Sequence, residues 1–200
     1  MCFTGFKCLD GWTYNEVTFK CYKLFKENIS WRSANEKCLS MLPSGNQRLI
    51  SRPHLATISN KEEDIFLHSL LGGFSNVWVG GKKLYDGHWI WLDGTKFSYK
   101  NWAPGEPNNS PNNGAGVGME DSIVINWKGY RQNAKMEWND SPANHFHYIN
   151  GFLCQYRAFW PDDETGDVNQ YCQALVLSPV VLDPISNQSK IKIQLGLGWP

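Results

Sequence analysis

Apolar residues recur at helical spacing in two early parts of the chain and at strand spacing elsewhere. Trp31, Ala34 and Cys38 would share one face of a first helix. Ser30 is a suitable N-cap for it, because its hydroxyl can accept a hydrogen bond from the first turn. Before this helix, the alternating apolar residues within 1–25 predict a short hairpin.

The second predicted helix is marked at both ends. Ser59 and Glu62 form a capping box, with Ser59 as the cap and the Glu62 carboxylate reaching back to it. Phe66 and Leu70 follow on one face of the helix. The pair Gly72-Gly73 then ends it, since glycine readily takes the left-handed conformation found after a helix.

Short apolar runs in the rest of the chain predict strands. The predicted strands are Val77–Gly80, Trp89–Leu92, Ser122–Ile125, Met136–Trp138 and Phe152–Tyr156. Two helices followed by a run of strands favour an α+β fold over a parallel α/β sheet. Residues 93–120 form a long irregular stretch, and a stretch of this length inside a compact domain is usually functional.

Composition excludes some classes of protein. The 200 residues carry a formal net charge of zero, so neither nucleic acid nor an anionic membrane is expected as the main partner. No apolar run approaches the roughly 18 residues that cross a membrane, and no signal peptide is visible. No nucleophile–base arrangement or cofactor loop is present, so we do not expect an enzyme.

The six cysteines indicate an oxidising compartment, because their number is even and no two have the close spacing of a structural zinc site. A bond between Cys8 and Cys21 would staple the predicted hairpin. The alternative is a set of six reduced, buried thiols in a cytosolic protein.

Oxygen-bearing side chains gather in three short motifs, which are Glu106-Pro107-Asn108, Glu120-Asp121 and Trp138-Asn139-Asp140. Five of these residues form a candidate metal site: Glu106, Asn108, Glu120, Asn139 and Asp140. Calcium binds six to eight oxygens, and three carboxylates brought together repel one another unless a cation lies between them. A cis peptide bond before Pro107 would turn the carbonyls of Glu106 and Asn108 to the same side. Taken singly, each motif would instead be read as a solvated loop.

With these motifs the chain resembles the C-type lectin family over residues 8–157. Three further segments carry the resemblance: His54–Ile58, Trp78-Val79-Gly80 and Asn101-Trp102. It implies a C-type lectin-like fold, with two helices packed on short antiparallel sheets and a long calcium-binding loop. The chain would then divide into an N-terminal segment (1–7), a carbohydrate-recognition domain (8–157) and an extension of unknown role (158–200).

The resemblance also implies disulfides. By resemblance, Cys38 pairs with Cys154 and Cys8 with Cys21. Cys2 and Cys172 have no counterpart in the family; they bridge the N-terminus to the extension or link two chains.

The resemblance further implies calcium-dependent binding of mannose, fucose and N-acetylglucosamine. Members with Glu-Pro-Asn favour these sugars, whereas members with Gln-Pro-Asp favour galactose. The five residues of the metal site would also contact the sugar, each hydroxyl donating to a carboxylate and accepting from an amide. The expected partners are glycans with terminal mannose-type sugars, bound outside the cell by a secreted protein or the outer portion of a membrane protein. Weak single sites favour a homo-oligomer. The alternative is a protein-interaction module or receptor ectodomain on the same fold.

The chain departs from the family at two places beside the motifs. Ser122 and Ala143 stand where most members have a second disulfide, and Lys82 and Lys83 stand where an acid of a further calcium site is expected. Sequons at Asn28 and Asn187 predict a glycoprotein.

Overall fold

The computed structural model describes residues 8–41, 51–110, 119–126 and 136–158. The chain divides into two units, Met1–Pro161 and Asp162–Pro200. The second unit lies wholly outside the described residues, as do Cys2, Cys172 and the sequon at Asn187.

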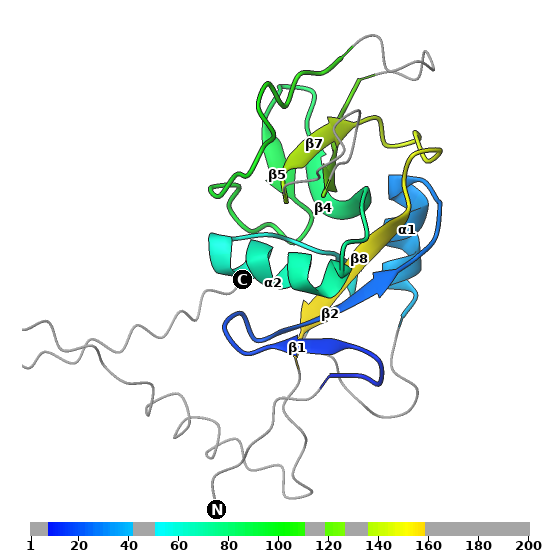
Figure 1. Cartoon of the computed structure of the whole chain (residues 1–200), viewed down its shortest axis with the longest axis vertical. Coiled ribbons are helices and arrows are strands. Elements are labelled where there is room, and N and C mark those ends of the chain that lie inside the picture. Colours follow the sequence, from blue (N-terminus) through cyan, green and yellow to red (C-terminus); the bar gives the residue numbers. More distant parts are fainter. Residues whose placement is uncertain (1–7, 42–50, 111–118, 127–135, 159–200) are drawn as a thin grey trace, which may run out of the picture. The chain divides into compact units, whose positions relative to one another are not determined.

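Two helices and eight strands make up the described part of the chain (Figure 1). The helices are α1 (Trp31–Leu39) and α2 (Lys61–Leu71). The strands are β1 (Thr13–Asn15), β2 (Lys20–Phe25), β3 (His54–Leu55), β4 (Val77–Lys83), β5 (Trp89–Trp91), β6 (Ser122–Ile125), β7 (Trp138–Ser141) and β8 (Gly151–Arg157). The predicted α+β class is therefore confirmed.

The strands form one mixed sheet in the order β1-β2-β8-β4-β6-β7, with β3 beside β8 and β5 beside β4. All strand pairs are antiparallel, as expected, except β4 with β8, which runs parallel and makes the sheet mixed. Pairing of β2 with β8, in the register Cys21↔Tyr156 to Phe25↔Phe152, joins the two ends of the domain.

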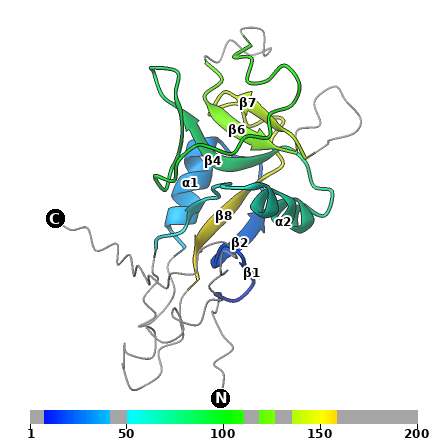
Figure 2. The ribbon, with the colours of Figure 1, turned by 90° about the vertical axis from the view of Figure 1, so that its left-hand side faces the viewer.

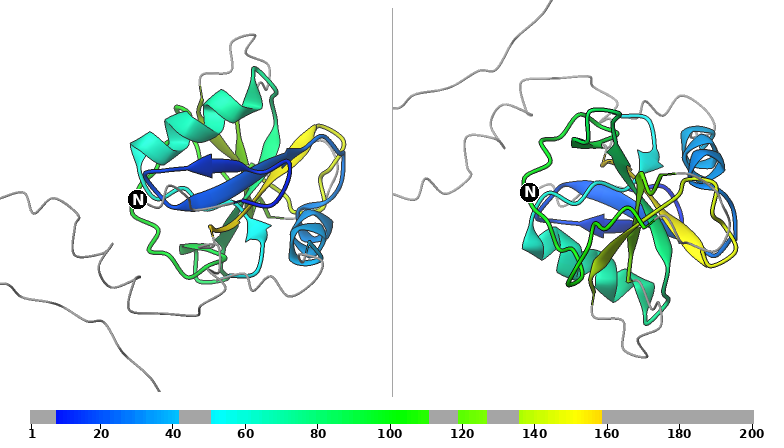
Figure 3. Two further views of the ribbon diagram at one scale, coloured as in Figure 1. Left: turned by 90° about the horizontal axis from the view of Figure 1, so that it is seen from below. Right: turned by 90° about the horizontal axis from the view of Figure 1, so that it is seen from above.

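Each face of the sheet is covered by one helix, as Figure 2 and Figure 3 show. Alternation along the central strands produces this arrangement, because successive side chains point to opposite faces. In β4, Val77 and Val79 pack in the cluster that holds Leu67 of α2, whereas Trp78 packs in the cluster that holds Trp31 of α1. These two clusters make up most of the core, and a smaller third one contains Cys21, Tyr156 and Ala158.

The α1 cap is as predicted, and the α2 cap lies one residue later than expected. The Ser30 hydroxyl accepts from the N–H of Ser33 at 3.2 Å. In α2 the cap is Asn60, whose Oδ1 accepts from the N–H of Glu63 at 2.8 Å, and the Glu63 carboxylate accepts from the N–H of Ser59 at 2.7 Å. The Asn60 carbonyl also accepts from the N–H of Asp64, the first bond of the helix, which Ser59 is placed too early to make. Gly72, with a φ of 54°, ends the helix as expected.

The strand predictions fail mainly where polar residues lie inside the sheet. Strand β7 is displaced from the predicted Met136–Trp138, because Met136 has a positive φ of 49° and the chain pairs with β6 only from Trp138 to Ser141. Strand β4 runs three residues further than predicted, and β3 was not expected.

Both disulfides implied by the resemblance are present. Cys8 is bonded to Cys21 and Cys38 to Cys154, which joins α1 to β8. Among the described residues, no helix is long and apolar enough to span a membrane.

Candidate functional site

The three motifs are linked by hydrogen bonds between the loop that joins β5 to β6, the segment before β6, and β7. Figure 1 shows the arrangement of β5 and β7. The N–H of Trp138 donates to the carbonyl of Asn101 at 2.8 Å, and the N–H of Ala103 donates back to the carbonyl of Trp138 at 2.9 Å. Pairing of Ser122 with Ser141 places Glu120, which lies just before β6, at the end of β7. Strand pairing therefore brings Glu120 and Asp140 to the loop that carries Glu106.

Three successive main-chain N–H groups bind the carboxylates in this place. Asp140 accepts from Asn108 at 3.1 Å through one oxygen and from Asn109 at 2.9 Å through the other. Glu120 accepts from the N–H of Ser110 at 2.6 Å. The loop is thus bonded to both β7 and the segment before β6.

Asn109 is a member of this arrangement that sequence reasoning missed. Its N–H donates to Asp140, and its side-chain oxygen accepts from the N–H of Glu120 at 3.1 Å. Its φ is 47°, a conformation that asparagine tolerates better than most residues. The sequence offered one signal, an asparagine directly after Glu-Pro-Asn.

Glu106 lies against Asp140. The Glu106–Pro107 peptide bond is cis, as the sequence suggested it could be. The Glu106 carboxylate accepts from the N–H of Asn108 at 3.1 Å. Burial, the hydrogen bond with Asp140 and the negative charge of Asp140 together raise the pKa of the Glu106 carboxyl to about 7, with burial contributing most.

The five predicted residues differ in exposure. Asp140, Glu120 and Asn139 are buried, Glu106 is half-buried, and Asn108 is exposed. The Asn139 amide donates to the main-chain carbonyl of Asp140. Glu106, Asn108, Glu120 and Asp140 are linked through the N–H groups of residues 108–110, whereas Asn139 joins them through its place beside Asp140 in β7.

In the part of the chain that the structure describes, no three His, Cys, Asp or Glu side chains are grouped closely enough to hold a metal ion. The chemistry of the five residues nevertheless fits a hard cation, because their side-chain oxygens match what calcium prefers. Carboxylate oxygens that accept one N–H keep a further lone pair. Burial and the hydrogen bond with Asp140 raise the pKa of Glu106 most, and a cation would offset a further cause, the negative charge of Asp140.

Asp121, the acid next to Glu120, is paired differently. Its carboxylate lies 2.5 Å from the ammonium of Lys82, which also donates to the Ser122 hydroxyl at 3.2 Å. The same ammonium lies 5.0 Å from the centre of the Trp31 ring. Lys82 therefore already supplies a positive charge beside Asp121.

Residues 27–156 match the family model described as the lectin C-type domain. Since this match covers more than half of the chain, the protein belongs to the C-type lectin family.

Individual relatives are similar over the same region. Ladderlectin of Oncorhynchus mykiss is 33% identical over 139 residues, which make up 67% of this chain and 61% of ladderlectin. The galactose-specific lectin nattectin of Thalassophryne nattereri is 33% identical over 105 residues, or 50% of this chain and 58% of nattectin. The chain thus spans less than two thirds of the length of these two curated relatives.

A solved structure supports the fold. The cow C-type carbohydrate-recognition domain of CD23, crystallised in the presence of a GlcNAc2Man3 oligosaccharide, is 26% identical and superposes with a TM-score of 0.58. The superposition covers 77% of this chain and 98% of the CD23 domain.

Proposed function

We propose that this chain binds terminal mannose-type sugars in a calcium-dependent manner. One observation carries the proposal: the N–H groups of residues 108–110 hold the carboxylates of Asp140 and Glu120 beside Glu106 and Asn108. This network links residues from three distant segments, which supports a shared site for their side-chain oxygens.

The alternation of acid and amide side chains supports a preference among sugars. A hydroxyl group can donate to the carboxylate of Glu106 or Glu120 and accept from the amide of Asn108 or Asn139. A bound calcium ion would supply two coordination places for neighbouring hydroxyls of one sugar. Exchanging the acid and the amide at residues 106 and 108 reverses the donor pattern, and with it the preferred sugar.

The comparisons support sugar binding in the family without deciding between sugars. The CD23 domain was crystallised with an oligosaccharide that contains mannose, whereas nattectin is named a galactose-specific lectin. Sugar preference is consequently the property to test.

The experiment is chromatography on immobilised mannose with calcium, followed by a chelator. We expect retention with calcium, release by the chelator, and a shift toward immobilised galactose in the Glu106→Gln/Asn108→Asp variant. Glu16→Gln, at an exposed carboxylate on the β1–β2 hairpin, is the matched control and should behave as wild type. Retention that persists after chelation would contradict the proposal.

The alternative, a protein-interaction module, predicts a different outcome. Such a protein would bind no glycan on an array in millimolar calcium. Because one sugar engages few atoms, monosaccharide affinity should be on the order of millimolar, and several domains presented together would be needed for firm binding.

We also propose that the sugar-binding domain is residues 8–157 and that it acts outside the cell. Strand β8 ends at Arg157. The two disulfides fit an oxidising compartment. Asn28 is exposed between β2 and α1, so its sequon is accessible for glycosylation, whereas Asn139 is buried.

A further inference from the structure

Helix α2 carries two adjacent buried carboxylates that bind opposite parts of the domain. Glu63 is 0% exposed and Asp64 is 1% exposed. A buried carboxylate is costly unless hydrogen-bond donors surround it. The donors around each one therefore show what it holds in place.

Asp64 is surrounded by donors from the loop and from β7. One of its oxygens accepts from the Tyr99 hydroxyl at 2.9 Å and from the Asn101 amide at 2.8 Å. The other accepts from the indole N–H of Trp138 at 3.3 Å, and the His68 imidazole lies 3.6 Å from it.

These donors lie directly beside the residues of the proposed site. Asn101 and Tyr99 begin the part of the loop that leads to Glu106, and Trp138 immediately precedes Asn139 and Asp140. The Asn101 amide also donates to the carbonyl of Met136 at 2.8 Å, which joins the loop to the approach of β7 a second time.

We infer that Asp64 is a positioning residue for the calcium and sugar site, because one carboxylate fixes both segments that carry the candidate ligands. The inference rests on the proposed function. Asp64 touches none of the five candidate ligands in the bonds described, so it acts through Trp138 and Asn101. Replacing one of its oxygens by an amide NH2 would leave one side of the group without an acceptor for its donors and would loosen the loop against β7.

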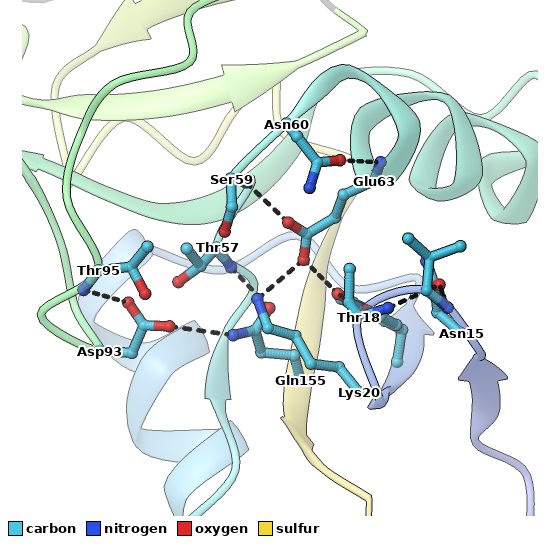
Figure 4. Close-up of polar contacts among 12 residues, drawn as sticks. Asn15, Thr18, Lys20, Thr57, Ser59, Asn60, Glu63, Asp93, Thr95 and Gln155 are labelled. Atoms are coloured by element: carbon cyan, nitrogen blue, oxygen red, sulfur yellow. Dashed lines mark hydrogen bonds and ion pairs between the residues drawn. The ribbon is translucent and has the colours of Figure 1, made fainter. Parts of the chain in front are cut away.

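Glu63 provides a matched comparison on the same helix. Its carboxylate accepts from Lys20 and from the N–H of Ser59 (Figure 4). It also accepts from the Tyr22 hydroxyl. These partners lie on β2 and just before α2, and none of them belongs to residues 99–110 or to β7. Glu63 thus stabilises the hairpin side of the helix and contacts nothing that positions the proposed ligands.

The test compares Asp64→Asn with Glu63→Gln, since each change removes one buried charge with little change in volume. Both variants should unfold at a lower temperature in the presence of a chelator. Only Asp64→Asn should raise the calcium dissociation constant, by about tenfold. An unchanged dissociation constant in Asp64→Asn, or an equal rise in both variants, would overturn the inference.

A milder variant covers the case in which Asp64→Asn does not fold. Tyr99→Phe removes one donor and should weaken calcium binding in the same direction by a smaller factor. Wild-type affinity in Tyr99→Phe would then count against the inference.

Hydrogen exchange separates this inference from the proposed function. Without calcium, the amides of Ala103 and Trp138 should exchange faster in Asp64→Asn than in Glu63→Gln. If wild type binds no calcium, the proposed function fails, and the exchange rates alone test whether Asp64 fixes the loop against β7. Equal exchange rates in the two variants would show that it does not.

Discussion

Glu106 combines partial burial with a carboxylate neighbour, and both raise its pKa. Burial contributes most, followed by the hydrogen bond with Asp140 and the negative charge of Asp140. With a pKa of about 7, Glu106 is largely protonated in weak acid before calcium binds. Calcium must therefore displace this proton, which links calcium affinity to pH.

We predict that the calcium association constant is constant well above pH 7 and falls about tenfold for each pH unit below it. Stability in the absence of calcium should change in the opposite sense. A raised folded-state pKa contributes stability that is present below the unfolded value of 4.5 and is lost as the pH rises through about 7. Calcium titrations at several pH values measure the first effect, and unfolding in a chelator measures the second.

Glu106→Gln is the control for both measurements. The glutamine cannot titrate. The variant should therefore bind calcium more weakly, and its calcium association constant should depend much less on pH around pH 7. If wild type binds calcium with equal affinity at pH 6 and pH 8, then calcium does not displace a proton from Glu106.

The candidate ligands could be named from the sequence, since their side-chain oxygens and their grouping in three motifs are local properties. Their burial could not, because it depends on strand pairing. Asn139 and Asp140 are buried as members of β7, while Asn108 stays exposed on the loop. The part played by Asn109 also depends on contacts with distant residues.

At the scale of elements, α2 shows how one residue position changes the role of a side chain. Asn60 caps the helix and Glu63 bonds back to Ser59. A box placed one residue earlier would have made Glu62 the reciprocal partner. Glu63 is instead buried, where it also binds Lys20.

We predict that Asn60→Ala lowers the free energy of unfolding by about 1 kcal/mol, the usual cost of losing an N-cap side chain. Ser59→Ala should have little effect, because the bond from residue 59 to Glu63 uses the main-chain N–H. Urea unfolding of both variants measures the difference. If Ser59→Ala lowers the free energy of unfolding more than Asn60→Ala does, Ser59 is the cap, as predicted from the sequence.

Strand β7 shows the limit of periodicity as a guide. Its residues Asn139, Asp140 and Ser141 are polar, so the apolar pattern ends at Trp138. They are in a strand because β6 lies beside them and pairs with them from Ser122 to Ile125. Pairing between distant segments is not encoded in local alternation.

At the scale of the whole molecule, two disulfides close loops of very different length. The Cys38–Cys154 bond spans a sequence separation of 116 residues and the Cys8–Cys21 bond a separation of 13. A cross-link over a longer loop removes more conformational entropy from the unfolded chain.

We predict that replacing Cys38 and Cys154 by alanine costs more stability than replacing Cys8 and Cys21. The chain-entropy estimate is about 4.7 kcal/mol for a loop near the longer separation and about 3 kcal/mol for one near the shorter. Urea unfolding of both double variants, with their remaining cysteines oxidised, measures the two losses. A greater loss from the short loop would show that native packing, rather than loop entropy, controls the effect.

The sequence by itself determined the α+β class, both helices, the two disulfide pairs and the motifs of the candidate site, because these follow from local spacing and from family resemblance. Only the tertiary structure decided that β4 pairs with β8 in parallel, that β7 continues through Asp140, and that Asp64 joins the loop to that strand. The physical reason is that a buried polar residue is stable only beside its partners, and those partners come from segments that the chain brings together on folding.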